Sequence, residues 1–389
     1  MRNSLFVVSL AIFSMFFGAG NLIYPLITGL TAGKYTWLGM CGFLLTAALL
    51  PLLGLVTMIL FDGDYEAFFS RLGTTIGKVL IFCSMMIIGP VIAIPRIVTL
   101  SQAMIEPFIP LLNHAIIWHN IGFALLFLAI TFLASYKENR IIEVLGNIIS
   151  PILLLCISWI IGKGLFDGIH HTPVPCIEPT LLAVFSSNFI RGYETLDLLG
   201  AIFFGSIIIN LLKMNNNHES LKDLSKTGFK AGFIGIILLC FVYIGMSILS
   251  MLHGHGLYIN DAGQLFKEIS LRILGVNGTL IIAIAVLMAC LSTSIALAAV
   301  VGEYMQKTVF QKSVTHGWSV AITLLCCLPL SIFGLDKVLM LTGGPIVYIG
   351  YPIIITLTVC NLLLKLYNFK PVKVPVLVTG IIACLLYLQ

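Results

Sequence analysis

Charged residues are scarce in this sequence. Asp, Glu, Lys and Arg make up 10% of its 389 residues, whereas soluble domains carry about 25%. So few charges cannot cover a surface that faces water, and hydrophobic residues account for 59% of the chain. Apolar runs of roughly 20 residues, the length that crosses a ~30 Å hydrocarbon core, recur throughout. The scarcity of charge therefore excludes an ordinary soluble protein and indicates a protein that is dissolved in the bilayer.

Several functional motifs are also missing. The sequence has no basic block and no basic stripe interleaved with aromatic residues, which excludes nucleic acid as a partner. It shows no GxSxG, HExxH, Walker or GxGxxG pattern in a supporting context, so we do not expect an enzyme. The ten cysteines lack CxxC spacing and are typical of packing residues. Loops of about 20 to 25 residues at most leave no room for a soluble signalling domain, and no obligatory protein partner is indicated.

Long apolar runs bounded by polar clusters predict about eleven transmembrane helices. The chain is therefore expected to be an all-α membrane protein with one transmembrane domain over residues 1–389. The predicted spans lie near residues 4–27, 36–61, 76–102, 115–134, 141–162, 181–212, 228–252, 278–305, 316–334, 337–362 and 374–388.

The distribution of Lys and Arg predicts the orientation. If the N-terminus is cytoplasmic, the inside segments contain 14 of these residues and the outside segments contain 5. Cytoplasmic loops carry such an excess in membrane proteins. We therefore expect a cytoplasmic N-terminus and a multi-pass topology.

Two spans contain residues that a straight, lipid-facing helix would not choose. The first includes Gly18, Gly20, Asn21 and Pro25, and the sixth includes the segment 191–197 with three ionisable residues. Unwound backbone at membrane depth is tolerated only where protein or a water-filled cavity covers it. Because the sixth helix enters from the face opposite the first, the pattern predicts an inverted repeat with discontinuous helices 1 and 6, which is the pattern of a transporter.

The first interruption could bind both an anion and a cation. Small residues let a ligand approach the backbone, and the amides that open the following half-helix suit a carboxylate. Freed carbonyls, together with the side-chain oxygen of Asn21, suit sodium. The alternative is that Gly18 and Gly20 only permit close helix packing.

The sixth interruption places Arg191, Glu194 and Asp197 at intervals of three residues, where ionisable side chains are costly unless they face partners or a cavity. They could pair with one another. Alternatively, Arg191 and Glu194 could extend to the outer interface.

Two further positions are candidates. In the eighth span, Ser292, Thr293 and the carbonyl of Ala289 could give three oxygens to a monovalent cation, although such hydroxyls often bond back to their own helix. In the third span, Arg96 is a cation beside a proline kink. A role with substrate, a role in gating or a static pairing with an acid would each explain it.

Three segments together resemble a known family. The segment from Phe17 to Pro25, the segment from Gly192 to Asp197 followed by Phe204-Gly205, and the segment from Ala289 to Thr293 are similar to motifs of the branched-chain amino acid:cation symporter family, the LIVCS carriers. The likeness runs in the same order over nearly the whole chain.

The resemblance implies a leucine-transporter-type fold of five plus five helices in inverted repeats, here residues 1–163 and 181–362, with 374–388 as an extra helix. It also implies sodium-driven uptake of leucine, isoleucine and valine across a bacterial inner membrane, with Na⁺ as the coupling ion. A proton-coupled carrier of other hydrophobic amino acids such as methionine, or a non-transporting sensor, is the alternative.

The family's site residues carry over to positions of this sequence. The substrate would be bound by Gly18, by the amides of Ala19 and Gly20, and by Tyr193, Thr195 and Asp197. One cation would be held by Asn21 and another by Ser292, Thr293 and the carbonyls of Ala289, Ser14 and Phe17. Arg96, Arg191 and Glu194 would be gating or structural charges. The chain departs from the family at Leu196, where relatives commonly have Met, at Arg191, and in ending at an eleventh span rather than a twelfth.

Overall fold

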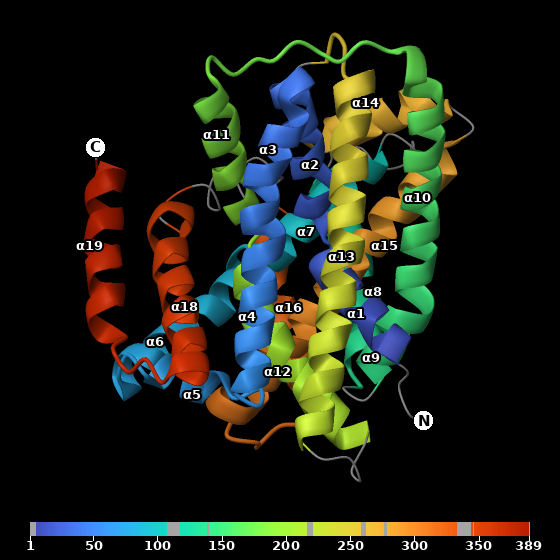
Figure 1. Cartoon of the computed structure of the whole chain (residues 1–389). Helices are drawn as coiled ribbons and strands as arrows, with labels where there is room; N and C mark the ends of the chain where they lie inside the picture. The colour runs from blue at the N-terminus through green and yellow to red at the C-terminus, as the bar shows by residue number, and fades with distance from the viewer. Residues whose placement is uncertain are drawn as a thin grey trace.

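The computed structural model of the chain is a bundle of helices (Figure 1). No strand occurs in the part of the chain that the structure describes. Eight helices within that part are long and apolar enough to cross a membrane, and three further apolar helices are shorter. The structure describes residues 5–106, 117–137, 140–215, 221–257, 262–275, 278–332, 344 and 346–388.

The helices of the first half follow the five predicted spans. They are α1 (Leu5–Phe16), α2 (Ala19–Ala32), η1 (Gly33–Tyr35), α3 (Thr36–Leu44), η2 (Leu45–Leu49), α4 (Leu50–Leu60), α5 (Tyr65–Ser70), α6 (Thr74–Met86), η3 (Ile87–Val91), α7 (Ala93–Ile105), α8 (Ile117–Ser135), α9 (Ile141–Val144), η6 (Leu145–Ile149), α10 (Ser150–Asp167) and η7 (Gly168–His170).

The helices of the second half follow the remaining spans. They are α11 (Leu181–Tyr193), α12 (Asp197–Asn215), α13 (Leu221–His253), α14 (Ala262–Leu274), α15 (Thr279–Tyr304), η9 (Met305–Val309), α16 (His316–Ser331), η10 (Ile346–Gly350), α18 (Tyr351–Tyr367) and α19 (Lys373–Leu388).

The predicted spans differ from these helices in a few places. Helix α13 begins at residue 221 rather than 228, and α14 lies in a segment for which no helix was predicted. The first part of the predicted span 337–362 lies outside the described residues, apart from residue 344, and η10 with α18 covers the rest. Apolar length predicts where a helix crosses lipid but not how far it continues into water, so the ends were the least predictable feature.

Both predicted interruptions are present. The first spanning helix is divided into α1 and α2, and the sixth into α11 and α12. Figure 1 shows α2 above α1 and α12 below α11, so the two broken helices run in opposite directions. The second break contains Leu196 with a φ of 62°, a left-handed conformation that a branched residue seldom adopts. Such backbone strain persists only where the surrounding structure imposes it, commonly at a functional site.

The helices pack in two groups. In one group, α13 contacts α1 and α2, α12 contacts α4, and α11 contacts α3. In the other, α15 contacts α7, α8 and α16. The two broken helices therefore belong to the first group, and the second group packs beside them.

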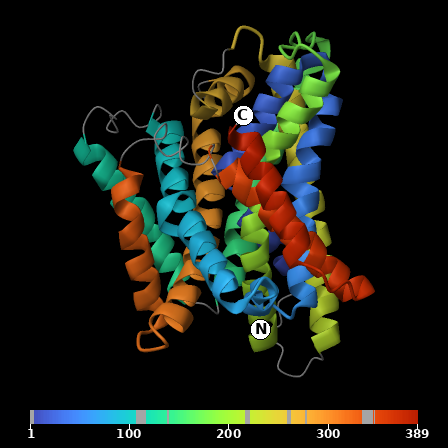
Figure 2. The ribbon, with the colours of Figure 1, turned by 90° about the vertical axis from the view of Figure 1, so that its left-hand side faces the viewer.

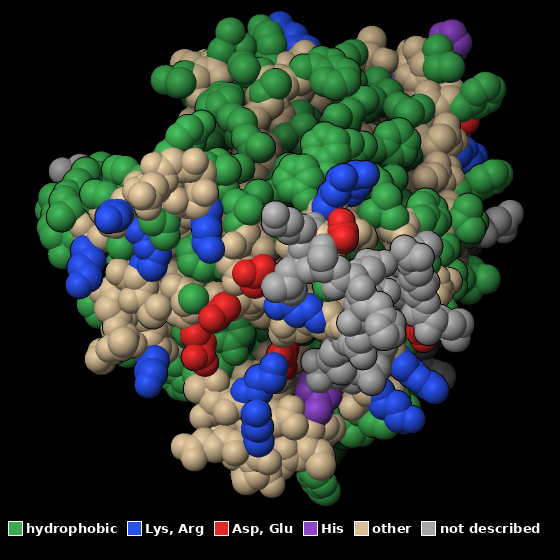
Figure 3. Space-filling view, turned by 60° about the horizontal axis from the view of Figure 1, so that its bottom comes forward, with side chains coloured by type: hydrophobic (Ala, Val, Ile, Leu, Met, Phe, Trp, Pro, Cys, Tyr) green, Lys and Arg blue, Asp and Glu red, His purple; other side chains and the backbone are tan. Residues whose placement is uncertain are grey.

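The hairpin of α18 and α19 lies on the outside of the bundle, at the left edge in Figure 1 and in front of other helices in Figure 2. Large apolar side chains are exposed on several helices, among them Trp118 on α8 and Leu155 and Phe166 on α10, each more than 70% exposed. Charged side chains gather instead at the end of the bundle that carries the N-terminus, where Figure 3 shows Lys, Arg, Asp and Glu together. This distribution suits apolar sides in contact with lipid and a charged end in water.

Candidate functional site

The first break is stabilised by a side chain from another helix. In an uninterrupted helix the carbonyls of Ser14 and Met15 would accept from the amides four residues later, but the amide of Gly18 turns to the carbonyl of Phe16 at 2.9 Å. The hydroxyl of Thr293 on α15 instead lies 3.1 Å from the Met15 carbonyl oxygen and 3.5 Å from that of Ser14. A Cβ at Gly18 would lie 2.8 Å from the Thr293 hydroxyl oxygen, so this approach requires glycine.

The second break is stabilised in the same manner. Arg96 of α7 donates from Nη1 to the carbonyl of Glu194 at 2.8 Å and from Nη2 to the carbonyl of Thr195 at 3.4 Å. Both carbonyls lie in the interval between α11 and α12. Each break therefore offers freed carbonyls that a polar side chain of the second helix group satisfies, as buried peptide groups require.

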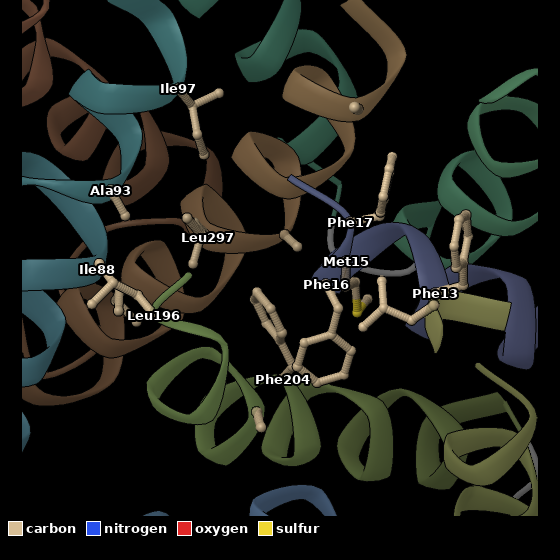
Figure 4. Packing of buried hydrophobic residues seen from close by; sticks show 14 of the residues in the cluster. Phe13, Met15, Phe16, Phe17, Ile88, Ala93, Ile97, Leu196, Phe204 and Leu297 are labelled. Carbon is tan, nitrogen blue, oxygen red and sulfur yellow. The ribbon is translucent and has the colours of Figure 1, made fainter. Parts of the chain in front are cut away.

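The two breaks meet at one small cavity of about 30 Å³. Apolar side chains from several helices surround it, with Phe16 and Phe204 in edge-to-face contact at 5.5 Å and with Ile88, Ile97 and Leu297 beside them (Figure 4). The polar side of the cavity brings together residues from four predicted segments. These lining residues are Gly18, Gly20, Asn21, Arg96, Thr195, Asp197 and Thr293.

Asn21, Asp197 and Tyr243 form a buried polar cluster beside this cavity. The side-chain amide of Asn21 donates to the Asp197 carboxylate and to the Phe16 carbonyl, each at 2.7 Å. It also contacts the Tyr243 hydroxyl, which donates to the same carboxylate oxygen at 3.4 Å. Three oxygens, one of them anionic, thus surround one amide nitrogen, an arrangement that also suits a monovalent cation.

The remaining predicted cation ligands lie on α1 and α15 or between α1 and α2. Ser292 is fully buried and its hydroxyl donates to the carbonyl of Ala289 at 2.8 Å. This is the backbone bonding that hydroxyls in membrane helices often make. The side chain of Phe17, whose carbonyl was a predicted ligand, stacks on Phe13 with ring centroids 5.4 Å apart.

Arg191 takes part in a separate network. It donates to Thr31 of α2 and to Asn188, each at 2.8 Å, and lies 3.7 Å from the carboxylate of Glu178. The carboxylate of Glu194 faces both Arg191 and Arg96 and interacts with the hydroxyl of Tyr24. Arg191 thus forms its ion pair with Glu178, which lies outside the predicted trio of Arg191, Glu194 and Asp197.

Of the residues predicted to bind the substrate, Tyr193 lies away from the cavity, and Ala19 is described only by its backbone. The Tyr193 ring packs on Tyr351 at 5.5 Å and on Phe189 at 5.2 Å rather than lining the cavity, as far as the described residues show. Ala19 is the first residue of α2. Sequence reasoning missed Tyr243, which sits in an apolar run of α13 without a local motif.

The whole chain, residues 1–389, matches the family described as Branched-chain amino acid transport protein. The chain belongs to this family. The branched-chain amino acid permease BrnQ of Bacillus subtilis (strain 168) is 32% identical to this family member over 372 residues, 94% of this chain and 82% of that protein. The permease BraB of the same organism is 28% identical over 364 residues, 93% of this chain and 80% of that protein.

Solved structures agree on the fold. The structure of MhsT in complex with L-phenylalanine matches with a TM-score of 0.61 at 15% sequence identity, and the matched region covers 99% of this chain and 97% of the MhsT chain. Mhp1, a nucleobase-cation-symport-1 family transporter, has a TM-score of 0.58 at 14% identity and covers 99% and 92%. The predicted leucine-transporter-type fold is confirmed. The present chain is therefore an integral membrane protein of an amino-acid transport family, and its relatives are permeases and carriers rather than enzymes.

Proposed function

We propose that this protein imports leucine, isoleucine and valine by alternating access, coupled to sodium. The observation that carries the proposal is the cavity between two broken helices of opposite direction. It combines freed peptide groups, a buried carboxylate and apolar walls, which are the features that an aliphatic amino acid and a cation need together.

The apolar walls of the cavity favour a substrate with a branched aliphatic side chain. Phe16, Ile97, Phe204 and Leu297 offer no polar group to a substrate side chain. An apolar pocket separates side chains that differ by one methylene by only about 1–3 kcal/mol. Shared use of leucine, isoleucine and valine is therefore expected, consistent with relatives that are named branched-chain amino acid permeases.

Two places are candidates for the coupling cation. The first is the cluster of Asn21 with Asp197 and Tyr243, and the second is the contact of Thr293 with the freed carbonyls of α1. Each joins oxygens of a broken helix to oxygens of another helix. A cation in either place would hold the break in one geometry, so it would raise substrate affinity, and substrate would raise cation affinity by the same factor.

The size of the cavity supports alternating access. A volume of about 30 Å³ is far below the roughly 300–1,000 Å³ of pockets that hold small-molecule ligands, so an amino acid enters only if the surrounding helices separate. Thr293 and Arg96 are polar ties between the two helix groups at this point. We infer that these ties loosen and re-form as the group with the broken helices moves against the other.

We also propose a cytoplasmic N-terminus in a bacterial plasma membrane. The excess of Lys and Arg in alternate segments supports it, and the named relatives are bacterial.

A proton-coupled carrier is the competing hypothesis, and one observation favours it. The buried carboxylate of Asp197 is hydrogen-bonded by the neutral groups of Asn21 and Tyr243, so a proton could neutralise it as well as a metal cation.

Transport by purified protein in liposomes tests the proposal. Uptake of labelled leucine should rise with an inward sodium gradient and should be inhibited by unlabelled isoleucine and valine. Uptake that does not depend on sodium but depends on a pH gradient would show that protons, rather than sodium, drive transport. A protein that transports none of the aliphatic amino acids would remove the proposed function.

A further inference from the structure

Arg96 is a buried cation with unused hydrogen-bond donors. Its side chain is 5% exposed and lines the cavity between the breaks. A guanidinium carries five N–H groups and stays protonated in proteins. Two of them donate to the carbonyls of Glu194 and Thr195, while Nε is buried and has no partner within the described part of the chain. A buried donor without a partner is costly, so its retention calls for a ligand.

The guanidinium of Arg96 also lies close to the first break. A Cβ at Gly20 would lie 3.4 Å from Nη2, so this nitrogen lies close to the backbone near the start of α2. The Nη1 and Nη2 ends are directed to the carbonyls of the second break. Three N–H groups remain, one each on Nη1, Nη2 and Nε. In a guanidinium the N–H of Nε and one N–H of Nη2 point in parallel, as a carboxylate requires for bidentate binding.

A buried anion lies across the same cavity. Asp197 also lines it and interacts electrostatically with Arg96. The cavity therefore offers one fixed positive and one fixed negative group, with apolar walls beyond them. A free α-amino acid carries the complementary pair, a carboxylate and an ammonium group on one carbon.

We propose that Arg96 binds the carboxylate of the amino-acid substrate through its Nε–Nη2 edge, while Asp197 receives the ammonium group. This inference rests on the proposed function. It restricts the substrate to α-amino acids with both groups free, and it excludes amines and amino-acid amides. Because the substrate zwitterion is neutral overall, its entry leaves the net charge of the buried site unchanged, which limits the cost of carrying charges through the membrane.

The competing explanation is that Arg96 only supports the second break. A purely supporting residue would affect every ligand of the site alike, since its loss would distort the backbone that all of them contact. A carboxylate-binding residue affects only ligands that have a carboxylate. The ratio of two affinities therefore separates the explanations.

The experiment compares leucine with leucinamide, in which a neutral amide replaces the carboxylate. Competition against labelled leucine, or ligand-induced thermal stabilisation where binding is weak, gives both affinities at saturating sodium. The variants are Arg96→Gln and Arg96→Lys. Arg191→Gln is the matched control, because Arg191 also lies near the second break but is bonded to Thr31, Asn188 and Glu178.

We expect the wild-type protein to prefer leucine strongly over leucinamide. In Arg96→Gln this preference should fall at least tenfold, which corresponds to about 1.4 kcal/mol, mainly through weaker leucine binding. Arg96→Lys should give an intermediate ratio, since an ammonium is a point charge without the paired N–H geometry. Arg191→Gln should keep the wild-type ratio.

Equal losses for the two ligands, with an unchanged ratio, would overturn the inference. If Arg96→Gln does not fold, Arg96→Lys decides by the same ratio. If the wild-type protein binds leucine but the Arg96 variants keep its ratio of leucine to leucinamide affinity, only this inference is wrong. If the wild-type protein binds no leucine, the proposed function is wrong as well.

Discussion

Thr293 provides the sharpest test of the cation site on α1. Replacing it by Val removes the hydroxyl and nearly preserves the shape of the side chain. The freed carbonyls of Ser14 and Met15 then lose their donor from α15. An unsatisfied buried polar group costs about 1–3 kcal/mol, and a bound cation would lose one ligand oxygen.

The magnitude follows from that single oxygen. A loss of about 1.4 kcal/mol in cation binding raises the half-saturating sodium concentration about tenfold. Because cation and substrate affinities are linked, the KM for leucine should return to within about threefold of the wild-type value once sodium is saturating. Thr293→Ser keeps the hydroxyl and should keep the wild-type sodium dependence.

The assay measures leucine uptake into liposomes while sodium is varied against choline at constant ionic strength. Ser294→Ala is the matched control, because the Ser294 hydroxyl neighbours Thr293 on α15 but lies 3.3 Å from the Thr131 hydroxyl on α8. A wild-type sodium dependence in Thr293→Val would refute the reasoning. So would a change of equal size in Ser294→Ala.

Three further substitutions test the site and the packing. Gly18→Ala should reduce leucine uptake at least tenfold, because its Cβ would lie 2.8 Å from the Thr293 hydroxyl oxygen; wild-type uptake would argue against the close approach of these residues. Asp197→Asn should abolish uptake in liposomes while the protein elutes normally from a sizing column, because a neutral amide cannot balance a buried cation or ammonium group; retained uptake would count against its role. Gly29→Ala should lower the melting temperature in detergent, because a Cβ there would lie 1.9 Å from a backbone carbonyl of α13. Gly122→Ala, with nothing within 4 Å of its Cβ, should not, and equal melting temperatures for the two variants would contradict the packing.

The fold was largely predictable from the sequence because its signals are local. Apolar runs indicated the spans, and each predicted span coincides with helices wherever the structure describes it. The two interruptions were visible in the same way. Gly18 and Asn21 in one apolar run, and ionisable residues beside Gly192 in another, are residues that an unbroken helix in lipid would avoid. The short helix α14 was not predicted, because its segment lacks the apolar length of a span.

The contacts of the site could be settled only by the tertiary structure. Arg96 meets the carbonyl of a residue 98 positions later, and Thr293 meets a carbonyl 278 positions earlier. Tyr243 joins Asp197 from a helix with no polar motif around it. A carbonyl freed by a break must be satisfied, and the sequence indicates this need. Which side chain meets it depends on which helix passes the break, and that is decided by the packing of the whole bundle.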